Sequence, residues 1–129
     1  MKTPTACAIL ATCVSAVCLL AIGLDAQAAQ PISVRVRTAG DLAELCGVNT
    51  KDSAADAKIN WCHGFAQGVV DLELQHTADK KPFCFPSPPP PRAKTLDEFV
   101  NWVRAMPDHR SLGATEGLFK FLAERFPCK

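Results

Sequence analysis

The chain has no tyrosine, no excess of charge of either sign and no closely spaced cysteine pair of the C-x-x-C kind. Its 14 lysines and arginines against 13 acidic residues give a formal net charge of +1, which offers no electrostatic basis for binding nucleic acid or an anionic membrane surface. A phosphate-binding glycine loop, a G-x-S-x-G nucleophile motif and close Cys/His pairs for zinc are also missing. We therefore expect no cofactor, no metal ligands and no nucleic-acid partner.

One cysteine stands beside a histidine, Cys62-His63, which is the kind of pair that a cysteine hydrolase uses. Adjacent residues on a helix point about 100° apart, so these two side chains do not face each other. A catalytic thiolate must also be free, whereas the cysteines of an exported chain are expected to be paired. The other histidines, His76 and His109, complete no zinc-site pattern. We predict no catalytic residues and expect that the protein is not an enzyme.

The N-terminal segment has the pattern of an export signal. Lys2 precedes an apolar run from Ala6 to Leu24, and Ala26-Gln27-Ala28 fits the small-x-small pattern that signal peptidase reads. We predict a signal peptide over residues 1–28, with cleavage after Ala29 as the alternative. An uncleaved membrane anchor is a second alternative, but the run lacks a basic stop-transfer flank. The mature domain, residues 29–129, is then expected to be exported, without further contact with the membrane.

Seven cysteines divide between the leader and the mature domain. Cys7, Cys13 and Cys18 lie in the leader, where we interpret them as small apolar residues; a lipid-attachment cysteine is the alternative. The other four predict a disulfide framework, because the number is even and the chain is short and exported. They are Cys46, Cys62, Cys84 and Cys128.

Four cysteines allow three pairings, and the sequence does not choose among them. We prefer Cys46 with Cys62, which would link the first two helices, and Cys84 with Cys128, which would fasten the C-terminal tail. Each bond would stabilise a domain of this size by about 2–4 kcal/mol.

Helix signals begin after an extended segment, Pro31–Arg37, in which apolar and basic residues alternate. Thr38 and Asp41 predict a capping box for a first helix that Gly47 ends. Ser53 is expected to cap the second helix, which Lys80-Lys81-Pro82 ends. Its apolar stripe comprises Ile59, Cys62, Phe65, Ala66, Val69, Leu72 and His76.

Gly64 and Gly68 lie beside that stripe, and each costs the helix about 1 kcal/mol. We expect them to allow tight packing inside the core; a contact between two chains is the alternative. Trp61, Phe65 and Trp102 are expected to fill the core or a dimer interface, with exposed binding anchors as the alternative for the two tryptophans.

The second half of the chain begins with a proline run, Pro86–Pro91, expected to be a stiff polyproline II spacer or else a preordered surface for a partner. Thr95 and Glu98 predict a capping box for a third helix, which Met106-Pro107 ends. A charged turn, Asp108-His109-Arg110, then precedes a last helix from about Leu112 to Arg125. Helix-favouring composition agrees, so we predict an all-α fold: a small up-and-down bundle of about four helices stapled by two disulfides.

The order of these motifs resembles the Rap/Tai family of type VI secretion immunity proteins. After the signal peptide, the likeness rests on Asp41-Leu42-x-x-Leu45-Cys46, Cys62-x-Gly64-Phe65-x-x-Gly68-Val69-x-Asp71, Phe83-Cys84-x-Pro86, Met106-Pro107 and Phe126-Pro127-Cys128. It covers essentially the whole mature chain. The resemblance implies a small, helical, periplasmic protein that binds and occludes a secreted peptidoglycan amidase effector, and several members act as homodimers.

Exposed polar residues between helices are the candidates for binding this partner. They are Asp108, His109 and Arg110 in the charged turn, and Arg92 and Lys94 after the proline run; a solvated loop charge is the alternative for each. We expect the turn from Asp108 to Gly113 to enter the cleft of the effector. Two other functions remain open: a periplasmic acid-stress chaperone that binds unfolded proteins at low pH, and a periplasmic structural or regulatory subunit without a toxin partner.

Overall fold

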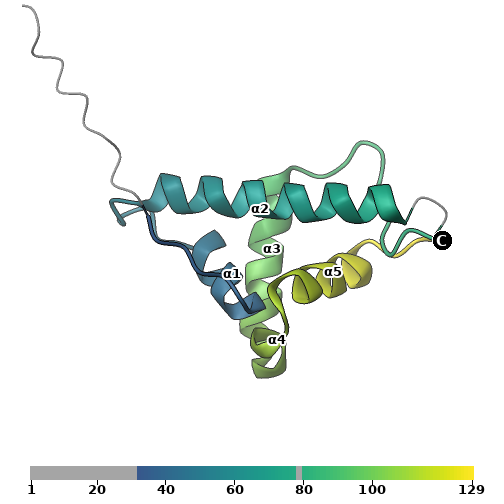
Figure 1. The fold of residues 1–129 in the computed structure, drawn as a ribbon. Helices are drawn as coiled ribbons and strands as arrows, with labels where there is room; N and C mark the ends of the chain where they lie inside the picture. The colour runs from purple at the N-terminus through teal and green to yellow at the C-terminus, as the bar shows by residue number, and fades with distance from the viewer. Residues whose placement is uncertain (1–31, 78–79) are drawn as a thin grey trace, which may run out of the picture. The chain divides into compact units, whose positions relative to one another are not determined.

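Five α-helices form the fold in the computed structural model, which describes residues 32–77 and 80–129 (Figure 1). They are α1 (Ala39–Cys46), α2 (Ala55–His76), α3 (Arg92–Ala105), α4 (Pro107–Ser111) and α5 (Ala114–Arg125). Within these ranges the only β pairing is an isolated bridge between Thr38 and Gly113. The all-α prediction is therefore confirmed. The helix beyond the expected four is α4, which forms where the sequence predicted a charged turn, and the predicted leader lies outside the described residues.

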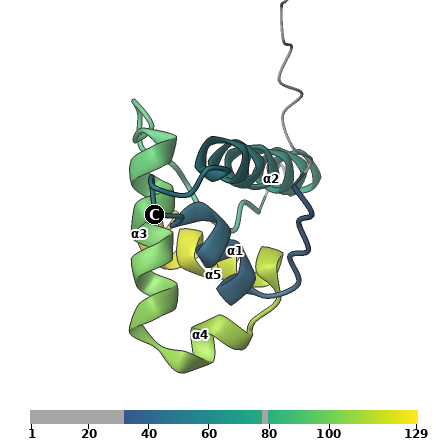
Figure 2. The ribbon, with the colours of Figure 1, turned by 90° about the vertical axis from the view of Figure 1, so that its left-hand side faces the viewer.

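The short helix α1 lies at the centre of the arrangement. It contacts each of the other four helices. In the view of Figure 1, α2 lies above α1, and α3 passes behind α2; Figure 2 shows the same helices from the side. Ala39 and Leu42 are fully buried. Small residues allow α1 and α5 to approach closely, since a Cβ atom on Gly117 would lie only 2.5 Å from the Cβ of Ala39.

The core draws on every helix except α4 and on the segment before α3. Aromatic rings fill its larger spaces: the ring centroids of Phe99 and Phe121 are 5.7 Å apart, and Phe83 packs against Phe119 at 5.9 Å. Such buried apolar groups supply the main driving force for folding. The largest fully buried side chains are Phe83, Phe99, Leu42, Leu118, Leu122, Val103 and Cys62.

Two disulfides join these parts, with the pairing that the sequence analysis preferred. Cys46 at the end of α1 is bonded to Cys62 in α2. Cys84 is bonded to Cys128, so the segment after α2 is fastened to the end of the chain. Backbone pairing supports this second link, because the Cys84 N–H donates to the Phe126 carbonyl at 2.8 Å.

The first capping box forms as predicted. The Asp41 N–H donates to Thr38 Oγ1 at 3.1 Å, and Asp41 Oδ2 accepts from the Thr38 and Arg37 N–H groups, each at 3.0 Å. These backbone donors lower the pKa of the Asp41 carboxyl, first that of Thr38 and then that of Arg37.

The other two predicted caps are wrong. Before α2, Ala54 occupies the cap position in place of Ser53, and the carboxylate of Asp52 accepts from the Ala54 N–H at 2.8 Å. Thr95 lies inside α3 and is buried, because that helix already begins at Arg92 after Pro91. Proline lacks an N–H, which the first turn of a helix does not need to bond, so the proline run leads directly into the helix. The predicted end of α3 at Met106-Pro107 is confirmed.

The two glycines of α2 contradict the expectation that they permit close packing within the core. Gly64 and Gly68 are exposed, and a Cβ atom added to either would have no other atom within 4 Å. The predicted apolar stripe is also only partly buried: Cys62 and Ala66 are in the core, but Leu72 is 56 % exposed. In the second half of α2, Val70 and Leu74 pack against the core cluster beside Val69.

Candidate functional site

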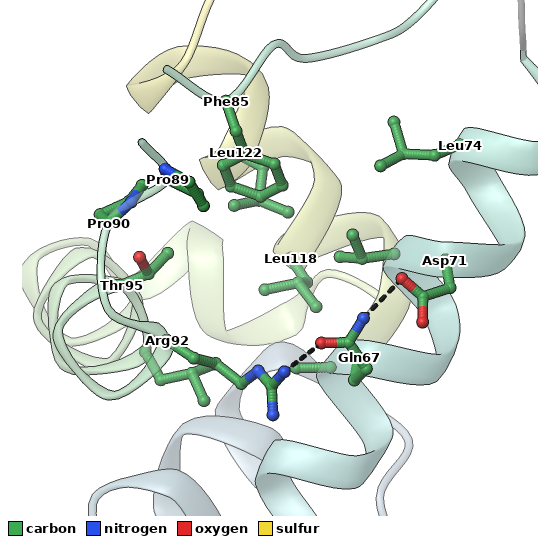
Figure 3. Close-up of a pocket in the computed structure, with 13 residues that line it drawn as sticks. Gln67, Asp71, Leu74, Phe85, Pro89, Pro90, Arg92, Thr95, Leu118 and Leu122 are labelled. Atoms are coloured by element: carbon green, nitrogen blue, oxygen red, sulfur yellow. Dashed lines mark hydrogen bonds between the residues drawn. The ribbon is translucent and has the colours of Figure 1, made fainter. Parts of the chain in front are cut away.

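An apolar groove lies between α2, the proline segment, α3 and α5 (Figure 3). Its cavity volume is about 360 Å³, within the range typical of ligand-binding pockets. Apolar side chains make up most of its walls: Ala66, Val70, Leu74, Phe85, Pro89, Pro90, Leu96, Leu118 and Leu122. The remaining lining residues are Gln67, Asp71, Arg92 and Thr95.

A hydrogen-bonded set of polar side chains joins two sides of the groove. The guanidinium of Arg92, the first residue of α3, donates to Gln67 Oε1 on α2, and Gln67 Nε2 donates to Asp71 Oδ1 one turn further along the same helix (Figure 3). All three side chains are close to solvent. The groove therefore combines an apolar interior with a cation and an anion, each bonded to the same neutral amide.

The five residues predicted to bind a partner lie at the two ends of α3. Arg92 and the exposed Lys94 are in its first turn, whereas Asp108, His109 and Arg110 lie in α4, which follows α3 in the chain. Figure 2 shows α4 at one end of α3. Fourteen helical residues separate these positions by about 20 Å at 1.5 Å per residue. Only Arg92 lines the groove.

Of the three predicted partner-binding residues in α4, His109 and Arg110 contact other residues of the same chain. The His109 ring stacks on Trp102 with centroids 3.6 Å apart, and its Nδ1 lies 2.9 Å from the Trp102 carbonyl oxygen. Arg110 Nη2 forms an ion pair with Glu44 Oε1 at 2.8 Å. Asp108 is exposed. The charged turn is therefore a rigid corner of the fold that presents the Asp108 carboxylate to solvent.

The tryptophans are half-buried members of the core rather than exposed anchors. Trp61 stacks on Phe65 with centroids 5.3 Å apart, and both pack against the core cluster. Trp102 packs against Phe99 and Phe121, while its Nε1 donates to Glu124 at 2.8 Å.

Ion pairs that alter pKa values lie outside the groove. Lys58 lowers the pKa of the Asp52 carboxyl through a hydrogen bond, and Arg125 does the same for Glu98. Glu98 in turn raises the pKa of Arg125. In the part of the chain that the structure describes, no group of three or more His, Cys, Asp or Glu side chains is placed to hold a metal ion. Cys62 is buried and bonded, so its sulfur is not a free nucleophile.

Sequence reasoning missed the groove apart from Arg92. Its apolar lining residues have the spacing of ordinary core positions, and nothing in the sequence shows that they surround a hollow. The signal that was available is the proline run, because two of its residues, Pro89 and Pro90, line the groove.

The comparison with protein families identifies the chain. The sequence model described as "Rap1a immunity proteins" matches residues 38–128, a range that contains all five helices and both disulfides. The chain belongs to this family. No curated protein and no solved structure matches the chain.

Membership in the Rap1a family indicates what kind of functional surface to expect. An immunity protein acts by binding an effector protein, so the family implies a non-catalytic inhibitor whose functional surface is a contact with that effector. In the described ranges, no helix is long and apolar enough to cross a membrane.

Proposed function

We propose that this Rap1a protein acts in the periplasm, where it binds a peptidoglycan amidase delivered by a type VI secretion system and occludes its active site. The observation that carries the proposal is the family match over residues 38–128. The export pattern of residues 1–28 supports the compartment. Two disulfides also support it, because such bonds persist in the oxidising periplasm and are rare in the cytosol.

The structure suits inhibition by binding. Two disulfides fix the end of α1 to α2 and the end of the chain to the segment after α2. A protein held in one conformation loses little conformational entropy on association, so more of its contact energy appears as affinity.

The proposed contact residues are those of the two ends of α3: Asp108, His109 and Arg110 on α4, and Arg92 and Lys94 on the first turn. Because His109 and Arg110 are held by Trp102 and Glu44, α4 would enter the effector's cleft as a preformed element. A homodimer is proposed as the acting state, and light scattering of the purified protein measures it.

An inhibition assay tests this function. Protein purified with intact disulfides is immobilised and exposed to lysate of its source at neutral pH, and any bound cell-wall amidase is then produced alone. We expect the immunity protein to stop that amidase from releasing peptides from purified peptidoglycan, with complete inhibition near an equimolar ratio. Protein that has been reduced and alkylated serves as the control.

The proposal fails if no amidase is captured, or if a captured amidase keeps its activity in excess immunity protein. Retention of many unrelated periplasmic proteins at pH 3, but none at neutral pH, would favour an acid-stress chaperone instead.

A further inference from the structure

The apolar groove is a partly open hollow between α2, the proline segment, α3 and α5. Val70 and Leu74 of α2 line it together with Phe85 and with Leu118 and Leu122 of α5. Figure 3 shows Leu74 on the α2 side, and Leu118 and Leu122 on α5. Leu118 and Leu122 are almost completely buried, whereas Val70, Leu74 and Phe85 keep part of their apolar surface open to water. Covering that surface would gain about 25 cal/mol for each Å². A concave, mostly apolar hollow of this volume has the form of a binding pocket.

Rigid walls keep the groove from closing. Pro89 and Pro90 form one side, and proline fixes the backbone angle φ. Phe85 follows Cys84, whose disulfide to Cys128 fastens this segment to the end of α5, and its ring packs against Phe126 at 5.1 Å. The hollow is therefore a lasting feature of the fold, already shaped for an occupant.

Charge at the rim indicates the chemistry of that occupant. The guanidinium of Arg92 donates to the neutral Gln67 amide, and among the described side chains it forms no ion pair. A guanidinium has five N–H donors, so it has capacity for a carboxylate in addition to Gln67. Asp71 is linked to Arg92 only through Gln67 and leaves that capacity unused.

We propose that this groove receives an extended segment of the effector, which inserts one aliphatic or aromatic side chain between Val70 and Leu118 and places a carboxylate on Arg92. The inference rests on the proposed function for the identity of the partner. A protein segment is the occupant because the family binds a protein and because Arg92, one of the two charged residues that line the apolar hollow, forms no ion pair among the described side chains. Buried apolar anchors of this kind carry much of the energy of protein interfaces.

Two substitutions alter the groove, and each has a matched control. Val70→Phe fills the hollow, and Leu72→Phe adds the same ring two residues away at an exposed position that does not line it. Arg92→Glu reverses the rim charge, and Lys120→Glu makes the same charge change at an exposed position of α5 outside the groove. Melting temperatures show whether each variant keeps the fold.

A displayed peptide library, selected on the purified disulfide-bonded protein, tests the groove without any effector. We expect enriched peptides to carry a large apolar residue close to Asp or Glu. Their affinity should fall by about tenfold or more for Val70→Phe and Arg92→Glu, as for the loss of an interface anchor, and stay unchanged for the two controls. Absence of enriched peptides, or equal binding to all variants, would overturn the proposal.

The amidase assay separates this inference from the proposed function. If wild-type protein inhibits the amidase and both groove variants inhibit it equally well, the immunity function stands and the groove proposal fails. If wild-type protein inhibits nothing, the function fails, and the peptide selection alone decides the groove. A dimer that Val70→Phe converts to monomer would show that a second copy fills the groove, which also contradicts the proposal.

Discussion

Glycine has opposite consequences at two positions of this fold. A Cβ atom on Gly117 would lie 2.5 Å from that of Ala39, whereas one on Gly64 would meet no atom within 4 Å. We therefore expect Gly117→Ala to destabilise the protein by about 1–3 kcal/mol, because it overpacks the contact of α1 with α5. Gly64→Ala should stabilise it by about 1 kcal/mol, since alanine is the better helix former. Urea denaturation of both variants measures the difference.

Gly68→Ala is the internal check on that comparison, because Gly68 has the same open surroundings as Gly64. If both alanine variants of α2 instead lost stability, another chain would have to cover this side of the helix in solution. The expectation that these glycines pack inside the core failed for a simple reason. The sequence shows that two small residues share one side of a helix but does not show whether anything lies opposite.

At the scale of elements, local signals were predictable and contacts between elements were not. Thr38 with Asp41 and Thr95 with Glu98 look alike as sequence patterns, yet only the first is a capping box. The difference arises because Pro91 allows α3 to begin one turn earlier, which places Thr95 inside the helix. Met106-Pro107 ended α3 as predicted, since that signal depends only on proline itself.

The groove was even less predictable from the sequence than the helix caps. Its lining comes from three separate stretches of the chain, namely α2, the proline segment with the start of α3, and α5, so no local pattern contains it. Arg92 was selected from the sequence as an exposed charge. It is a candidate binding residue in the structure because it lies beside the apolar hollow, and the packing of α2 against α5 creates that hollow.

The charged helix α4 can be tested through its exposed acidic side chain. We expect Asp108→Lys to weaken binding to the captured amidase by about tenfold or more, because a reversed charge at a contact costs several kcal/mol. Calorimetric titration measures this affinity. Asp97→Lys, which makes the same change at an exposed position of α3, should bind normally. Unchanged affinity for Asp108→Lys, with an unchanged melting temperature, would place the contact elsewhere.

For the whole molecule, the lowered pKa values of three carboxyl groups predict that the free energy of unfolding decreases in acid. Backbone N–H donors lower the pKa of Asp41, Lys58 lowers that of Asp52, and Arg125 lowers that of Glu98, from ordinary values of 3.8 for aspartate and 4.5 for glutamate. The unfolded chain therefore binds protons at higher pH than the folded one. This contribution is fully present above about pH 6 and is lost as the pH falls below about 4.

Melting temperatures measured between pH 7 and pH 2.5 check this expectation. The double variant Asp41→Asn/Glu98→Gln should melt lower at pH 7 and decline less steeply in acid, because two of the three groups no longer titrate. A wild-type melting temperature that stays constant down to pH 2.5 would contradict the assignment.

The family and the all-helical, disulfide-linked character of the molecule were accessible from the sequence, because they depend on the order of motifs, on helix signals and on the number of cysteines in an exported chain. The central position of α1 was not accessible from the sequence, and it has a consequence for how the protein unfolds. Eight residues are too few for a helix to persist alone in water, yet α1 contacts each of the other four helices. Unfolding of any of those helices would expose part of α1 to solvent, and a helix this short is not stable without its packing contacts. We therefore expect the five helices to unfold together, so that an effector bound to any one of them stabilises the whole domain.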